Sequence, residues 1–206
     1  MKVEKQWYII RHGETEPNRM QIIQGSGIDA SLNDRGKRQA RDFFSAYRHI
    51  PFDAVYTSAL IRTKESVQPF LDLGIPHLSL SQLNEISWGE KDGTLVIAAE
   101  KLLYSALIRD WEAGLLDRSF NQGESPNMVA KRLNHAIEIL MKREDKLSLM
   151  CIHGRTLRIL LCLLTGKSIS QMENFLHSNL SLYILSLQNG NWTIDLHNDI
   201  SHLQHD

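Results

Sequence analysis

The sequence has few cysteines and no long apolar run, and both absences narrow what the protein can be. The two cysteines, Cys151 and Cys162, lie in apolar sequence and lack the spacing of a metal-binding pair. We therefore expect reduced core thiols in a cytoplasmic protein. The longest apolar run covers only residues 159–164, which is too short to cross a bilayer. Residues 1–6 are mostly polar, so we expect no secretory signal.

The sequence also lacks a large net charge, internal repeats and linkers. The formal net charge is −1, so no global basic field favours nucleic acid or a membrane as a partner, and an anion site would have to be local. The chain contains no internal repeat, no low-complexity segment and no linker rich in glycine, serine or proline. Its length suits a single domain, residues 1–206, that buries a full core without disulfides.

The sequence does contain two apolar stretches that each end abruptly on histidine and glycine. Residues 7–10 are followed by Arg11-His12-Gly13, and residues 147–152 are followed by His153-Gly154. Burying such polar groups beside a core strand is costly unless they meet an anion or another partner. Ligands of open α/β sheets bind at the carboxyl ends of strands. A surface turn would explain one such pair equally well, but two pairs arise by chance far less often and favour a shared polar site.

Amphipathic segments alternate with these strands. Apolar residues at helical spacing predict core-facing stripes, and capping residues mark the expected starts: Asn33, Ser58 and Ser125, with Pro126 at the first helical position. Gly166 closes the last segment. The helices predicted in this way cover about 33–47, 59–69, 96–111, 125–142 and 156–165.

Short apolar segments complete a predicted sheet. Residues 54–57 indicate a strand, and 180–187 and 192–196 flank Asn189-Gly190, a signal for a type I′ hairpin. Strands alternating with helices predict an α/β layered fold whose sheet is mostly parallel, with an antiparallel hairpin at one edge. Residues 85–122 are expected to form a helical cap over the site. Residues 197–206 hold three histidines that could chelate a metal weakly, but we interpret them as a solvated end.

Two further residues are candidates for the site. Arg62 falls in the first turns of a predicted helix, where a cation is unfavourable unless an anion lies close. The alternative for Arg62 is a solvated surface arginine. Glu85 stands between Leu83 and Ile86, so it is expected to be partly buried, which suits a carboxyl group to proton transfer. An exposed glutamate is the plainer alternative.

Together, Arg11, His12, Arg62, Glu85 and His153 resemble the active-site set of the histidine phosphatase superfamily, also called the phosphoglycerate mutase-like family. Two segments depart from its pattern. Arg155 stands where a small or uncharged residue is usual, so it either adds a cation near the pocket or points to solvent, and Lys91-Asp92 replaces an aromatic–acid pair. The matching motifs, in the family's order, are Arg11-His12-Gly13-Glu14-Thr15 with Asn18; Gln24-Gly25, Asp29, Leu32 and Gly36; Ser58-Ala59-Leu60-Ile61-Arg62-Thr63; Leu83-Asn84-Glu85 with Gly89 and Gly93; Gly123-Glu124-Ser125; and Cys151-Ile152-His153-Gly154 with Arg158.

The resemblance implies a three-layer α/β/α sandwich and a mechanism without a metal or a cofactor. Neutral His12 would attack phosphorus and form a phosphohistidine. Arg11, Arg62 and a cationic His153 would hold the phosphoryl oxygens. Glu85 would protonate the leaving oxygen and then take a proton from water. The resemblance also places Asn18, Gln24, Gly25 and Gly154 beside the substrate.

The activity that the resemblance favours is hydrolysis of a small phosphorylated metabolite, with inorganic phosphate as product. The alternative is a mutase, which returns the phosphoryl group to a substrate, although the family's mutases are generally longer. A second alternative is a non-catalytic phospholigand-binding module, which predicts loss of His12, Arg62 or Glu85, and none is lost. A homodimer is left open.

Overall fold

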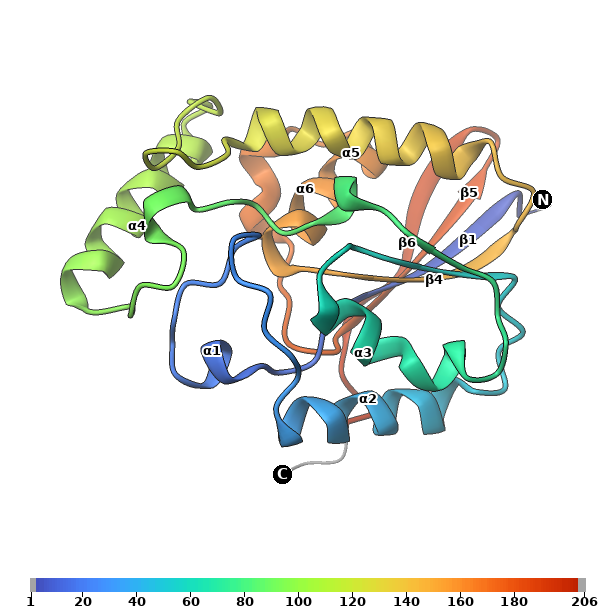
Figure 1. Ribbon diagram of the computed structural model, residues 1–206. Helices are drawn as coiled ribbons and strands as arrows, with labels where there is room; N and C mark the ends of the chain where they lie inside the picture. Colours follow the sequence, from blue (N-terminus) through green and yellow to red (C-terminus); the bar gives the residue numbers. More distant parts are fainter. Residues whose placement is uncertain (1–2, 204–206) are drawn as a thin grey trace.

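The computed structural model describes residues 3–203 and consists of one six-stranded sheet between two layers of helices (Figure 1). The sheet has the order β3-β2-β4-β1-β5-β6. The β1–β4, β4–β2 and β2–β3 pairs are parallel, while β1–β5 and β5–β6 are antiparallel. The predicted α/β fold, with a mostly parallel sheet and an antiparallel edge, is therefore confirmed. The strands are β1 (Lys5–Arg11), β2 (Ala54–Thr57), β3 (His77–Ser79), β4 (Leu147–Ile152), β5 (Leu182–Gln188) and β6 (Asn191–Asp199).

Helices cover both faces of this sheet. In Figure 1, α5 and α6 lie on one face and α2 and α3 on the other. Along β1, the side chains of Trp7 and Ile9 join the core under α5 and α6, whereas Ile10 joins the core under α2 and α3. Because alternate strand residues face opposite sides, an uninterrupted apolar run fits a strand that is buried on both. The helices are α1 (Glu16–Arg19), α2 (Asp34–Tyr47), α3 (Ile61–Leu71), α4 (Ala98–Glu112), α5 (Pro126–Met141) and α6 (Gly154–Thr165), with 3₁₀ turns η1 (Ser81–Leu83), η2 (Gly89–Lys91) and η3 (Ile169–Asn174).

The predicted caps are confirmed at two helices and wrong at a third. Asn33 caps α2 and Ser125 caps α5 through their side chains. By contrast, α3 begins two residues later than predicted, and its N-cap, Leu60, makes no side-chain cap. The Ser58 hydroxyl does accept from the Leu60 N–H at 3.1 Å, but it also contacts His153. Ser58 therefore belongs to the polar site and not to the helix end.

The C-terminal hairpin forms as predicted, but the segment after it is not simply solvated. Asn189 and Gly190 have φ values of 52° and 74°, which a type I′ turn requires. Beyond β6, the Nε2 of His202 donates to the Leu180 carbonyl at 2.9 Å, and its ring packs against Phe43. The solvated-end interpretation is wrong for His202, and His205 lies outside the described residues. Within residues 3–203, no three His, Cys, Asp or Glu side chains are grouped as metal ligands.

The segment between η1 and α5 leaves the sheet and carries α4, which lies beyond the carboxyl ends of β1 and β4 in Figure 1. Aromatic residues hold it together: Trp88 stacks on Trp111 with ring centroids 5.9 Å apart and also contacts Tyr104 and Phe120. The segment therefore lies on the side of the sheet at which the two His–Gly pairs follow β1 and β4.

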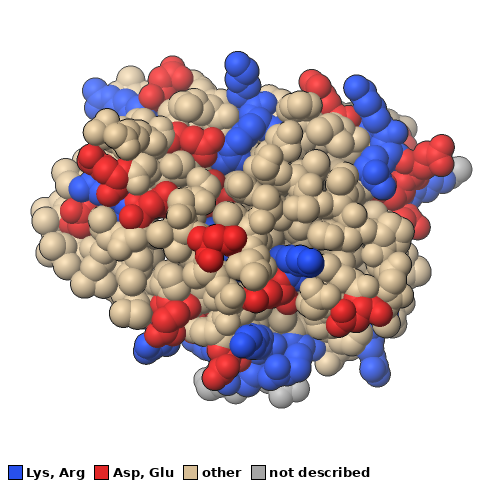
Figure 2. Space-filling model, viewed as in Figure 1, with Lys and Arg blue, Asp and Glu red and all other residues tan. Residues whose placement is uncertain are grey.

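The described surface fits the small net charge. On the face in Figure 2, acidic and basic residues are interspersed, and no single sign dominates the view. No helix within residues 3–203 combines the length and apolarity needed to cross a membrane.

Candidate active site

His12 lies at the carboxyl end of β1, where its main-chain N–H donates to Ile152 of β4 at 3.0 Å. The side chain is 3% exposed. Its Nδ1 lies 2.7 Å from the Gly13 carbonyl oxygen. Because a carbonyl oxygen only accepts, Nδ1 carries the proton and Nε2 keeps its lone pair. Burial, followed by the charges of Arg62 and Arg11, lowers the pKa of His12 well below 6.5. The imidazole is therefore neutral and has one free nitrogen.

Arg62 is buried completely, so the solvated-arginine alternative is wrong. Its Nε donates to His153 Nδ1 at 3.2 Å, its Nη1 to the Ile28 carbonyl at 2.6 Å and its Nη2 to the Gly25 carbonyl at 3.3 Å. Burial lowers the pKa of Arg62 to about 10, which leaves it charged at neutral pH. Of the five N–H groups of a guanidinium, two remain for a ligand.

His153 faces His12, with ring centroids 5.2 Å apart. Its Nδ1 accepts from Arg62, so its Nε2 carries the proton and donates to Ser58 Oγ at 2.8 Å. Burial, followed by the charge of Arg62, lowers the pKa of His153 well below 6.5. With these contacts the ring is neutral. The cationic role implied by the resemblance requires His153 Nδ1 to gain a proton and lose the hydrogen bond from Arg62. That role stays a prediction.

Arg11 brings in a histidine that the sequence analysis missed. Its Nη1 donates to His177 Nδ1 at 3.3 Å. Burial, followed by the charges of Arg11 and Arg158, lowers the pKa of His177 to about 2, so this ring is a neutral acceptor. Gly154 allows the His177 ring to lie against the start of α6, because a Cβ at position 154 would lie 2.6 Å from His177 Cε1. His177 lies in the connection between η3 and β5, where nothing local marks it as functional.

Glu85 is 7% exposed, which excludes the exposed-glutamate alternative. Its Oε2 accepts from the Arg155 N–H at 3.1 Å. Its Oε1 accepts from the Thr156 N–H at 3.0 Å, the Thr156 hydroxyl at 3.1 Å and the Ile86 N–H at 3.0 Å. Arg155 and Thr156 are in the first turn of α6, whose main-chain N–H groups have no partner within the helix and here donate to Glu85. Thr156 is a second residue that sequence reasoning missed.

Asn18 and Gln24 belong to a hydrogen-bonded group that reaches the His12 main chain. Asn18 Nδ2 donates to Gln24 Oε1 at 3.2 Å, and Asn179 Nδ2 donates to Asn18 Oδ1 at 3.3 Å and to the His12 carbonyl at 2.9 Å. The Gly25 N–H instead donates to Asp92 Oδ1 at 2.7 Å, while its carbonyl accepts from Arg62. Gly25 therefore supports Arg62 through its main chain, and Asp92, within one of the two unusual segments, fixes that loop.

Arg155, the other departure from the family pattern, does not point to solvent. Its guanidinium is buried, pairs with Glu173, donates to Tyr104 Oη at 2.6 Å and lies 5.4 Å from the Trp111 ring centroid. Because Tyr104 and Trp111 belong to α4, Arg155 ties that helix to the start of α6. The same residue thus supports Glu85 through its main chain and α4 through its side chain.

Buried donors without partners indicate that this cluster suits an anion. Arg11 Nε, Gln24 Nε2 and Arg158 Nε are inaccessible and make no hydrogen bond within the described residues. Buried polar groups in native proteins are nearly always paired, and leaving one unpaired costs about 1–3 kcal/mol. A phosphoryl group, with several acceptor oxygens, matches such donors.

The chain belongs to the histidine phosphatase superfamily (branch 1), which residues 7–200 match, so the predicted family is confirmed. "Probable phosphoglycerate mutase GpmB" of Erwinia tasmaniensis is 28% identical over 211 residues, covering 97% of this chain and 95% of the relative. "Phosphoserine phosphatase 1" of Hydrogenobacter thermophilus is 26% identical over 184 residues, covering 87% and 85%. The crystal structure of a phosphoserine phosphatase mutant from Entamoeba histolytica, in complex with phosphoserine, has a TM-score of 0.84 at 22% identity, covers 97% and 100% of the two chains, and shows the shared fold. The family and its phosphatase-named members indicate an enzyme of the phosphoric monoester hydrolase type.

Acidification is expected to destabilise the protein steeply. His12, His153 and His177 have lowered pKa values in the folded protein, whereas in the unfolded chain they gain protons below about pH 6.5. The unfolded state then binds more protons, so the free energy of unfolding falls by up to about 1.4 kcal/mol per pH unit for each histidine. Urea unfolding measured between about pH 7.5 and pH 5 tests this.

The matched control for acidification is a variant of the exposed His49. His49→Gln should keep the slope of the wild type, whereas His177→Gln should make it shallower. A free energy of unfolding that stays constant over this range would contradict the neutral, buried state of these three rings.

Proposed function

We propose that the protein hydrolyses phosphomonoesters of small metabolites through a phosphohistidine on His12. The observation that carries the proposal is the neutral, buried His12, whose Nε2 is free and lies among the cations of Arg11 and Arg62. Nε2 attacks phosphorus, the P–O ester bond breaks, and Glu85 in its acid form gives its proton to the leaving oxygen. Water then attacks phosphorus, Glu85 takes its proton, and the P–N bond breaks to release inorganic phosphate.

The remaining polar groups have supporting roles in this proposal. Arg11 and the two free N–H groups of Arg62 hold phosphoryl oxygens, since guanidinium groups match phosphate geometry and stay charged. His153 would turn its Nε2–H from Ser58 to the same oxygens and stabilise the charge that develops in the transition state. Gln24 Nε2 and Asn18 add neutral hydrogen bonds, and Gly154 leaves room for His177 behind Arg11.

We further propose that residues 85–122 act as a cap that selects the leaving group. A cavity of about 350 Å³ lies between this segment and the loop before α2, and its lining includes Ile23, Gln24, Trp88, Val96 and Tyr104. Gln24 is shared with the phosphoryl site, and Tyr104 is bonded to Arg155, next to Glu85's donors. A leaving group in this cavity would depart past Glu85 and be recognised partly by aromatic side chains.

The test is hydrolysis of p-nitrophenyl phosphate by the wild-type protein in excess EDTA. We expect turnover that resists the chelator, because positioned cations fill the role of a metal. Acid-labile, base-stable phosphate on His12, trapped by rapid quench and located by mass spectrometry, should accompany it. Turnover that EDTA abolishes, or a phosphate found on another residue, would reject the proposal.

The second candidate is a mutase, which the mutase-named relative favours. The phosphohistidine is the same in both, and the difference is whether water or a second hydroxyl receives the phosphoryl group. Interconversion of 3-phosphoglycerate and 2-phosphoglycerate faster than their hydrolysis would place the mutase first. The non-catalytic alternative is disfavoured by the convergence of His12, Arg62 and Glu85 in one buried site.

The cytoplasm is the compartment we propose, on the basis of the cysteines. Cys151 and Cys162 are both free and buried. Burial raises the pKa of Cys162 to about 11 and raises that of Cys151 further, so neither is a reactive thiol. Two unpaired, unreactive thiols are typical of proteins in a reducing environment.

A further inference from the structure

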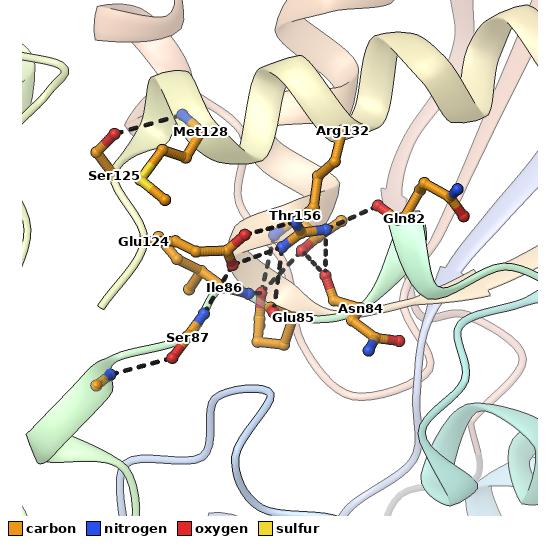
Figure 3. A network of polar contacts seen from close by, with 11 residues as sticks. Gln82, Asn84, Glu85, Ile86, Ser87, Glu124, Ser125, Met128, Arg132 and Thr156 are labelled. Carbon is orange, nitrogen blue, oxygen red and sulfur yellow. Dashed lines mark hydrogen bonds and ion pairs between the residues drawn. The ribbon is translucent and has the colours of Figure 1, made fainter. Parts of the chain in front are cut away.

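Arg132, on α5, donates hydrogen bonds to the main-chain segment that carries Glu85 and to the carboxylate of Glu124 (Figure 3). Nη1 donates to the carbonyls of Gln82 at 2.7 Å and Asn84 at 2.8 Å. Nη2 donates to the Glu85 carbonyl at 3.2 Å and to Glu124 Oε2 at 3.0 Å, and Nε donates to Glu124 Oε1 at 2.8 Å. All five N–H groups of a guanidinium are thus occupied.

Glu124 secures the same segment on the other side of Glu85. Its Oε2 accepts from the Ser87 N–H at 2.9 Å, and its own N–H donates to the Ser87 carbonyl at 2.8 Å. Glu124 directly precedes Ser125, which caps α5 through the Met128 N–H at 3.3 Å. Arg132 therefore lies on α5 and Glu124 directly before its cap, and their side chains are only 19% and 21% exposed.

We infer that Arg132 and Glu124 are positioning residues for proton transfer by Glu85, an inference that rests on the proposed function. The Glu85 carboxyl group is already positioned by the first turn of α6. Arg132 and Glu124 fix the main chain on either side of the same residue. With both ends held, the carboxyl oxygens have one location relative to the leaving group. A shift of about 1 Å in such a group can cost about 100-fold in rate.

The geometry requires arginine at position 132. Three carbonyls and a carboxylate accept from different edges of one plane, which a planar guanidinium can satisfy at once. An ammonium group has three donors on a single nitrogen and cannot reach all of them. Arg132→Lys therefore keeps the charge and most of the volume but loosens the segment that holds Glu85.

The experiment compares kcat/KM for two esters in Arg132→Lys and in the wild type. β-Glycerophosphate has an alkoxide leaving group that needs a proton, whereas 2,4-dinitrophenyl phosphate releases a stable phenolate without one. Because kcat/KM reports only the steps up to departure of the leaving group, the rate of phosphohistidine hydrolysis does not affect it. We expect a loss of about 10- to 100-fold for β-glycerophosphate and less than about 3-fold for the dinitrophenyl ester. Glu85→Gln should show the same selectivity to a greater extent.

Arg41→Lys is the matched control, because Arg41 is exposed on α2, outside the site and the proposed cap, and should change neither ester. Equal losses for both esters in Arg132→Lys, or no loss for either, would overturn the inference. If that variant fails to fold, Glu124→Gln replaces it. Its kcat/KM must then fall more for β-glycerophosphate than for the dinitrophenyl ester. If the wild type hydrolyses neither ester in a His12-dependent way, the proposed function itself fails, and the inference fails with it.

Discussion

Replacing His12 with Asn is expected to lower kcat for p-nitrophenyl phosphate by at least about 10⁴-fold, because removal of a covalent nucleophile typically costs about 10⁴ to 10⁶. Asparagine keeps a polar group of similar size, so the site should stay folded. The measurement is steady-state hydrolysis in EDTA, with the melting temperature of each protein recorded beside it. His49→Asn, at an exposed position, should behave as the wild type.

No neighbouring ring can replace His12 in this role. His153 has both nitrogens in hydrogen bonds, to Arg62 and Ser58. His177 uses its Nδ1 to accept from Arg11. Turnover in His12→Asn that approaches the wild-type rate would mean a contaminating phosphatase or a different nucleophile, and the assignment of His12 would be wrong.

The parts of the site that the sequence predicts are those in which one short segment holds both a structural and a chemical signal. His12 and His153 each follow a buried apolar strand, so the order of residues alone places them at the edge of a sheet. β1 and β4 are adjacent and parallel, which brings these two strand ends together. Asn33, Ser125 and Pro126 likewise act within a few residues of their own position, and those helix starts were predicted correctly.

The parts that sequence reasoning missed depend on contacts between distant segments. Ser58 is a good helix cap by local rules, but its hydroxyl bonds to His153, 95 residues away. His177 and Asn179 lie between η3 and β5 and become part of the site only because that connection returns beside β1. Arg155 is buried because Glu173, Tyr104 and Trp111 surround it, and none of them is close in sequence. Strand order was equally out of reach, since it is set by which faces pack.

Arg62→Lys is expected to lower kcat/KM by about 10³-fold, although the positive charge is kept. Removing one preorganised donor from an active site costs about 10² to 10³, and here the loss extends to three fixed contacts. Arg62 holds the Ile28 and Gly25 carbonyls and His153 Nδ1 while presenting two further N–H groups. A lysine cannot span these positions, so the loop before α2 and the His153 ring lose their common support.

The discriminating measurements for Arg62→Lys are kcat/KM for p-nitrophenyl phosphate and inhibition by inorganic phosphate. Both should weaken, because the arginine is proposed to bind phosphoryl oxygens in the ground state and more strongly in the transition state. Arg41→Lys makes the same chemical change at an exposed position on α2 and should leave both unchanged. A folded Arg62→Lys protein with near-normal kinetics would remove Arg62 from the phosphoryl site. The complete burial of Arg62 would then be explained by its hydrogen bonds to the Ile28 and Gly25 carbonyls and to His153 alone.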